Sequence, residues 1–150
     1  MRRTLAPATL SVERPHRSLS VTPWMDPNHT AHPTPADTDT EALERLRRFG
    51  GVKLVGGMIA LFLEALPQRL AAARRGLAHG DAHVVEHELH ALKSSSAQLG
   101  ALRMYRLSQE GEALARAGAL DDASHILDAL DAEQPRVHAW LTEARAVGDA

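Results

Sequence analysis

The sequence contains no cysteine and few aromatic residues. Its 150 residues include two Trp, two Phe and one Tyr, and its formal net charge is −2. Without cysteine, the chain has no disulfide framework, no thiolate nucleophile and no Cys-based zinc site. The scarcity of aromatic side chains and the absence of a net positive charge argue against a nucleic-acid partner, because nucleic acid favours a basic face and often aromatic side chains that stack on bases.

Long apolar runs are also lacking. No uninterrupted apolar run comes near the roughly 20 residues needed to cross a bilayer. The opening Met-Arg-Arg is not followed by the apolar segment of an export signal. The sequence therefore predicts a soluble cytoplasmic protein with no membrane partner. Its length predicts one domain, large enough to bury a core without disulfides or a structural metal.

Proline is distributed unevenly, with six of the eight residues in the first 35 positions. At this density proline removes backbone donors and moves the preceding residues out of the helical region. The same segment has no periodic apolar residues whose burial could offset the entropy of ordering it. We therefore predict a disordered tail over residues 1–37 and a folded domain over residues 38–150. For residues 1–24 the alternative is a translation start at Met25.

Beyond residue 38 the apolar residues follow helical spacing, and no alternating strand pattern is present. A short helix is expected from about Thr40, capped by Thr38 or Asp39, to the pair Gly50-Gly51. Longer helices are expected over residues 55–80, 81–99, 101–117 and 121–146, with a kink or restart at Pro67 and an irregularity at Pro135. Short connections between long helices favour antiparallel neighbours. The predicted fold class is all-α: an antiparallel up-and-down four-helix bundle with an additional short N-terminal helix.

The expected helix over residues 81–99 has two distinct stripes. An inward-facing stripe of apolar or small residues repeats at intervals of four and three; it consists of Val85, Leu89, Leu92, Ser96 and Leu99. An outward-leaning stripe consists of Glu86, His87, His90, Lys93, Ser94 and Ala97. Serine is a mediocre helix former, so the three consecutive serines are not explained by helix propensity. Small side chains beside an exposed His90 predict a surface that another protein's backbone can approach closely.

The segment that begins at His90 resembles the signature of histidine-containing phosphotransfer (HPt) domains. It reads His90-Ala91-Leu92-Lys93-Ser94-Ser95-Ser96-Ala97-Gln98-Leu99-Gly100-Ala101. The family pattern is His, any residue, an aliphatic residue, Lys, Gly, two small residues, two variable ones, an aliphatic residue and Gly. Around it, the family-like features are Phe62-Leu63 before Pro67, the step Gly80-Asp81, and Glu112 after the apolar run of the next helix.

Two positions depart from the family pattern. Ser94 stands where the family usually has Gly, and this small change is expected to make docking slower or more selective. Gly111 stands where an aliphatic residue commonly precedes the Glu, and this change is expected to cost some packing. The resemblance covers about residues 40–145.

The resemblance implies a phosphate carrier in a multistep phosphorelay rather than an autonomous enzyme. His90 would accept a phosphoryl group from the aspartyl phosphate of a response-regulator receiver domain and pass it to another receiver. Lys93 would neutralise the charge of the phosphoryl oxygens, and Mg²⁺ would be bound by the receiver, so no cofactor of the chain's own is implied. Receivers and a hybrid sensor histidine kinase would act in trans, and no Gly-rich nucleotide loop indicates an ATP site. The expected partner-docking residues are Glu86, His87, Ser94, Ala97, Gln98 and Glu112.

Two other functions stay open on the residues alone. Four histidines lie within twelve residues, and His83 and His87 have the i, i+4 spacing that can bind Zn²⁺, Ni²⁺ or Cu²⁺. No third-ligand motif accompanies this pair, so we predict no metal site. A purely structural helical adaptor is the remaining alternative if His90 is inert. Lys93 and its small neighbours favour phosphotransfer, because neither alternative requires that arrangement.

Overall fold

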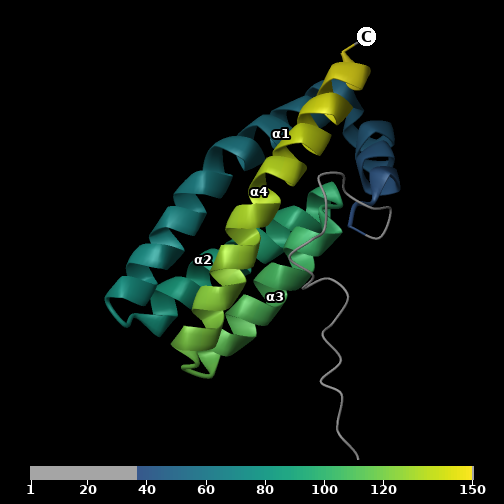
Figure 1. Ribbon diagram of the computed structural model, residues 1–150. Coiled ribbons are helices and arrows are strands. Elements are labelled where there is room, and N and C mark those ends of the chain that lie inside the picture. Colours follow the sequence, from purple (N-terminus) through teal and green to yellow (C-terminus); the bar gives the residue numbers. More distant parts are fainter. Residues whose placement is uncertain (1–36, 150) are drawn as a thin grey trace, which may run out of the picture.

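The structure, a computed structural model, describes residues 37–149. The predicted tail therefore lies outside the described residues except for Asp37, which is buried and whose carbonyl oxygen accepts a hydrogen bond from the Arg103 amide. Every regular element in residues 37–149 is a helix (Figure 1). The four helices are α1 (Thr40–Ala78), α2 (Ala82–Leu99), α3 (Leu102–Arg116) and α4 (Leu120–Gly148).

The four helices form the expected up-and-down bundle. α2 packs against α1 and α3, and α4 packs against α3 and α1. Short turns over residues 79–81, 100–101 and 117–119 make sequence neighbours antiparallel. The largest fully buried apolar side chains come from all four helices: Leu43, Ile59, Leu66, Leu89, Leu92, Leu99, Met104, Leu107, Leu127, Leu130 and Leu141. The all-α bundle predicted from apolar spacing is thus confirmed.

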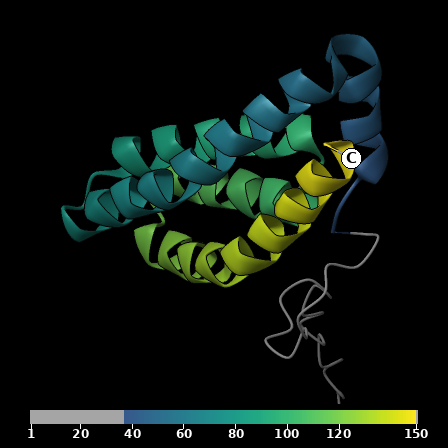
Figure 2. The ribbon, with the colours of Figure 1, turned by 90° about the horizontal axis from the view of Figure 1, so that it is seen from above.

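α1 is divided by a sharp bend near its start. Gly51 has φ 78° and ψ 171°, which is not helical backbone. It separates a short N-terminal helix from the long remainder of α1, and Figure 2 shows the two parts running in different directions. The Asp39 side chain caps the short helix by accepting a hydrogen bond from the Ala42 amide. This is the additional short helix that the sequence predicts.

Neither of the two helices that contain an internal proline is interrupted there, so the restart expected as one alternative at Pro67 is not observed. Gly51 is the one residue of α1 with non-helical backbone angles, so α1 continues through Pro67, and α4 likewise continues through Pro135. Leu66 and Leu70, on either side of Pro67, are both buried in the core. Packing of the flanking residues therefore holds the helix together across the hydrogen bond that proline cannot make.

Contrary to the expectation from uninterrupted apolar runs, α1 is long and apolar enough to cross a membrane. An 18-residue window within it has a mean hydropathy of 1.7, and no other helix among residues 37–149 passes the same test. One such helix is weak evidence, because a core helix can have the same composition. Val55, Ile59 and Phe62 of this helix lie in the core of the bundle, which accounts for part of its apolar character.

The turn between α2 and α3 is joined to the start of α1. Gly100 ends α2 in the left-handed conformation, with φ 81°. Its carbonyl oxygen accepts a hydrogen bond of 2.7 Å from the Asp39 amide. A Cβ atom at this position would lie 2.4 Å from the Asp39 carbonyl oxygen. Both the backbone angle and the close approach therefore require glycine here.

We predict that Gly100→Ala destabilises the bundle more than Gly118→Ala does. Both residues have positive φ, which costs a non-glycine residue about 1–2 kcal/mol, but nothing lies within 4 Å of a Cβ atom at Gly118. Chemical denaturation followed by circular dichroism gives the free energy of unfolding of each variant. Equal losses for the two variants would show that the contact with Asp39 does not constrain Gly100.

Candidate functional site

His90 lies in the middle of α2, on the side of that helix that faces α3. Its side chain is 61% exposed, and its Nδ1 atom lies 2.8 Å from Oε1 of Glu112 on α3. The inward-facing stripe predicted for this helix is confirmed, because Val85, Leu89, Leu92, Ser96 and Leu99 are its buried residues. Burial of that stripe fixes the rotation of α2 and so directs His90 outward.

Glu112 is a buried carboxylate that contacts several cationic or donor side chains. It is 3% exposed. Besides His90, its Oε1 accepts a hydrogen bond of 2.8 Å from Nη2 of Arg116, and its Oε2 lies 2.5 Å from Nζ of Lys93. Burial acts to raise the pKa of Glu112, but the hydrogen bonds and positive charges of Lys93 and His90 outweigh burial and lower the pKa to about 2. Glu112 is therefore ionised at neutral pH.

The ionised Glu112 determines which nitrogen of His90 carries the proton. A carboxylate can only accept hydrogen bonds, so Nδ1 of His90 must be the donor in this pair. In the neutral ring, Nε2 then holds the free lone pair. The site consequently presents an exposed imidazole with one nitrogen fixed to the protein and the other available for chemistry.

The packing of α3 against its neighbours brings Glu112 this close to α2. Gly111, the residue before it, has no side chain, and a Cβ atom there would lie 2.7 Å from Cδ1 of Leu89 and 3.0 Å from Cγ2 of Ile126. The space that an aliphatic side chain would need is therefore occupied by α2 and α4. A loss of packing was expected from this departure from the family pattern. The close approach of α2 and α4 to Gly111 compensates for the missing side chain.

Arg116 is part of the site, although the sequence analysis did not include it. Its Nη2 atom binds Glu112, four residues earlier on α3, and its Nε atom donates a hydrogen bond of 2.9 Å to Oε1 of Glu86 on α2. Hydrogen bonding and charge from Glu86, followed by those from Glu112, raise the pKa of Arg116. The i, i+4 spacing of Glu112 and Arg116 was the available signal, whereas the contact with Glu86 depends on how α2 and α3 pack.

The predicted docking residues of α2 lie at its surface. His87, Ser94, Ala97 and Gln98 are exposed, and Glu86 is half-buried. The Ser94 hydroxyl donates a hydrogen bond of 3.2 Å to the His90 carbonyl oxygen, so it is turned toward its own helix. Glu112 was grouped with these residues, but the structure buries it beneath His90 and Lys93 rather than exposing it to a partner.

A groove of about 260 Å³ between α1 and α2 adjoins the exposed face of α2. Gln98 and Ser95 line it from α2, and Met58, Leu61 and Arg69 are among the residues that line it from α1. Leu61 is 69% exposed. No docking role was predicted for α1 from the sequence.

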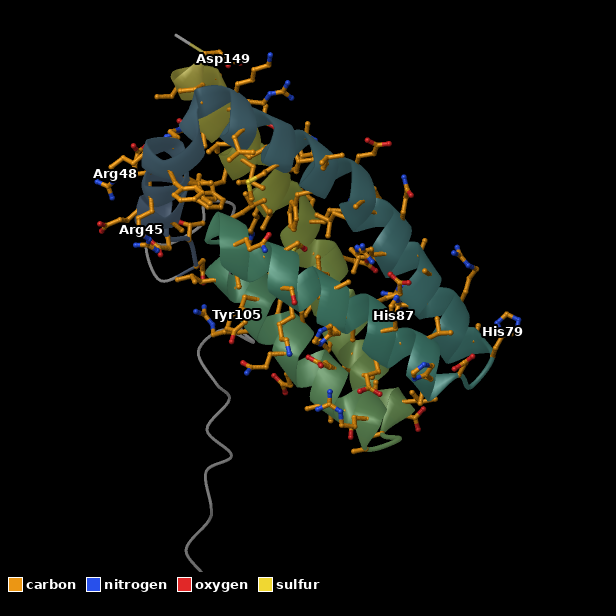
Figure 3. All side chains as sticks on the ribbon, turned by 180° about the vertical axis from the view of Figure 1, so that it is seen from behind. Arg45, Arg48, His79, His87, Tyr105 and Asp149 are labelled. Carbon is orange, nitrogen blue, oxygen red and sulfur yellow. The ribbon has the colours of Figure 1, made fainter. Side chains whose placement is uncertain are left out.

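The histidines of residues 37–149 do not gather into a metal site. Figure 3 shows His79 at the turn between α1 and α2, at the opposite end of the molecule from Arg45 and Arg48, with His87 on α2. Among residues 37–149, no group of three or more His, Asp or Glu side chains is arranged to hold a metal ion. The geometry therefore gives no support to the metal-binding alternative.

The family model described as Hpt domain matches residues 57–146. The chain belongs to the Hpt family. Membership of this family assigns the chain to histidine phosphotransfer in phosphorelays. The match includes all of α2 and α3, which carry His90, Lys93 and Glu112.

A solved Hpt structure has the same fold. The histidine-containing phosphotransfer protein B (HptB) from Pseudomonas aeruginosa PAO1 matches with a TM-score of 0.71 and 23% sequence identity, over 75% of this chain and 97% of that chain. At this identity the likeness concerns the fold. No curated protein matches the sequence.

The lowered pKa of Glu112 predicts how acid affects stability. A carboxyl group whose pKa is about 2 in the folded chain and about 4.5 when unfolded stabilises the fold above pH 4.5 and loses that effect as the pH falls toward 2. The stability advantage of the wild type over Glu112→Gln should therefore shrink between pH 4.5 and pH 2. Urea denaturation at several pH values measures this difference in the free energy of unfolding. Glu64→Gln, which alters an exposed residue of α1, is the control. A pH-independent difference would contradict the assignment.

Proposed function

We propose that this Hpt domain accepts a phosphoryl group on Nε2 of His90 from a receiver aspartyl phosphate and passes it to another receiver aspartate. The observation that carries this proposal is the pairing of exposed His90 with buried, ionised Glu112, which leaves Nε2 free. Few catalytic groups are required, because phosphoryl transfer depends mainly on in-line positioning and on stabilisation of charge.

The transfer step exchanges one bond to phosphorus for another. The lone pair of Nε2 attacks phosphorus, the P–O bond to the receiver's aspartate breaks, and the aspartate leaves as a carboxylate. The ring carries a positive charge while Nδ1 keeps its proton. Glu112, which accepts that proton's hydrogen bond at 2.8 Å, stabilises the charged ring. In the second transfer, the aspartate of another receiver attacks phosphorus, the P–N bond to Nε2 breaks, and His90 becomes neutral again.

Lys93 supplies positive charge beside the reacting atoms. It lies one turn after His90 on α2, and its side chain is 24% exposed. Its contact with Oε2 of Glu112 holds the ammonium group near His90 before a phosphoryl group arrives. A preorganised cation stabilises the charge on the phosphoryl oxygens without having to be brought in from solution.

The receiver would dock on the surface formed by α2 and the neighbouring groove. Ser94 and Ala97 are exposed and small, so they let a partner's backbone come close to His90. The apolar lining of the groove, including Met58 and Leu61, offers additional area for contact. Mg²⁺ and the acidic residues that bind it would belong to the receiver, and a hybrid sensor histidine kinase would supply the phosphoryl group in trans.

The direct test is phosphoryl transfer to His90→Gln. Incubation of the chain with phosphorylated receiver domains of the source organism should give an acid-labile phosphorylated product for the wild type. The product should be absent for His90→Gln, which has no nucleophilic ring nitrogen. His83→Gln, which alters another exposed histidine of α2, should behave as wild type. Absence of a phosphorylated product for the wild type, as expected of a purely structural adaptor, would overturn the proposal. Transfer to His90→Gln at the wild-type level would overturn it as well.

A second test concerns Lys93. We expect Lys93→Ala to slow transfer about tenfold or more, because one group that stabilises the developing charge is removed. The helical circular-dichroism signal should stay unchanged, since Glu112 keeps its contacts with His90 and Arg116. Rapid-quench measurement of the transfer rate gives the comparison, with Lys53→Ala on α1 as the control. Equal rates for the two variants would remove Lys93 from the mechanism.

A further inference from the structure

Arg116 is held between two carboxylates from two different helices. Its Nε atom binds Glu86 of α2 at 2.9 Å, and its Nη2 atom binds Glu112 of α3 at 2.8 Å. The Arg116 side chain is 62% exposed and that of Glu86 is 29% exposed. Both members of the Glu86–Arg116 ion pair therefore reach solvent, whereas Glu112 lies beneath them.

This ion pair is adjacent to His90. Glu86 lies four residues before His90, so the two side chains are neighbours on one face of α2. Arg116 Nη2 and His90 Nδ1 bind the same oxygen of Glu112, each at 2.8 Å. The two nitrogens are therefore less than twice that distance apart. The guanidinium group thus binds the Glu86 carboxylate and lies close to the imidazole ring.

A phosphoryl group on His90 changes the balance of charge at this position. A phosphoryl group adds roughly two negative charges and three acceptor oxygens, and Glu86, one turn away, repels it. The planar guanidinium group of Arg116 can donate two parallel hydrogen bonds to phosphoryl oxygens. Since exposed ion pairs contribute little to stability, Arg116 can leave Glu86 at small cost while it keeps its bond to Glu112.

We propose that Glu86 and the phosphoryl group on His90 compete for Arg116, so that the Glu86–Arg116 ion pair sets how the phosphoryl group is divided between this chain and its receiver. This inference rests on the proposed function of His90. Glu86 then acts as a positioning residue. It holds Arg116 beside the unphosphorylated imidazole ring of His90 and opposes retention of the phosphoryl group. Arg116 is the group that contacts the phosphoryl oxygens.

The competition predicts opposite effects for substitutions of the two partners. In exchange with a receiver that phosphorylates the wild type, Glu86→Gln should raise the equilibrium share of phosphoryl group on this chain about two- to fivefold, the range expected for an exposed ion pair. Arg116→Gln should lower it. In the double variant, the gain from Glu86→Gln should be smaller than in the wild-type background, because no guanidinium group remains to be released.

The equilibrium constant separates this role from docking and from stability. A residue that only contacts the receiver in the transient complex changes the rates of exchange in both directions and leaves the equilibrium unchanged. Arg74→Gln is the matched control, because Arg74 also bridges two carboxylates, Asp128 and Asp131, but does so between α1 and α4. It should leave the equilibrium constant at the wild-type value.

Three results would overturn the competition. An unchanged equilibrium in Glu86→Gln would show that the ion pair is purely structural or that Glu86 acts in docking. An equal effect of Glu86→Gln with and without Arg116 would show that Glu86 acts by repulsion alone. Absence of any exchange in the wild type would overturn the proposed function as well, so failure of the two proposals is distinguishable.

Discussion

The buried carboxylate of Glu112 is the group on which the arrangement of the site depends. A charged group taken out of water is destabilising unless it is paired and hydrogen-bonded. His90, Lys93 and Arg116 meet that requirement with three contacts on two oxygen atoms. The same contacts hold three exposed or partly exposed side chains in fixed positions. The surface of the site is thus organised from below by a residue that a partner does not reach.

The bundle provides the conditions for that contact. The buried stripe of α2 sets its rotation, and the absence of a side chain at Gly111 lets α3 come close to Leu89 and Ile126. Together these features bring a carboxylate on one helix within hydrogen-bonding distance of an imidazole on the next. The chemistry of His90 is therefore linked to helix packing, because a shift of α3 relative to α2 would separate Glu112 from its partners.

Much of the fold and the central residues of the site could be predicted from the sequence, because both depend on local spacing. The interval of four and three identifies the buried side of α2, and the His90 segment carries the family signature. Contacts between helices could not be predicted in the same way. The bond from Arg116 to Glu86 and the burial of Glu112 depend on how α3 packs, and the continuity of α1 at Pro67 depends on its buried flanking residues.

The hydrogen bond from Nδ1 of His90 to Glu112 has a consequence for the chemical identity of the phosphorylated chain. Phosphohistidine exists as two regioisomers, which differ in the ring nitrogen that bears phosphorus. With Nδ1 occupied by the protein, the proposed reaction yields a single regioisomer. The folded site would thereby impose a regiochemical selectivity that free histidine lacks, and it does so through a side chain on a different helix.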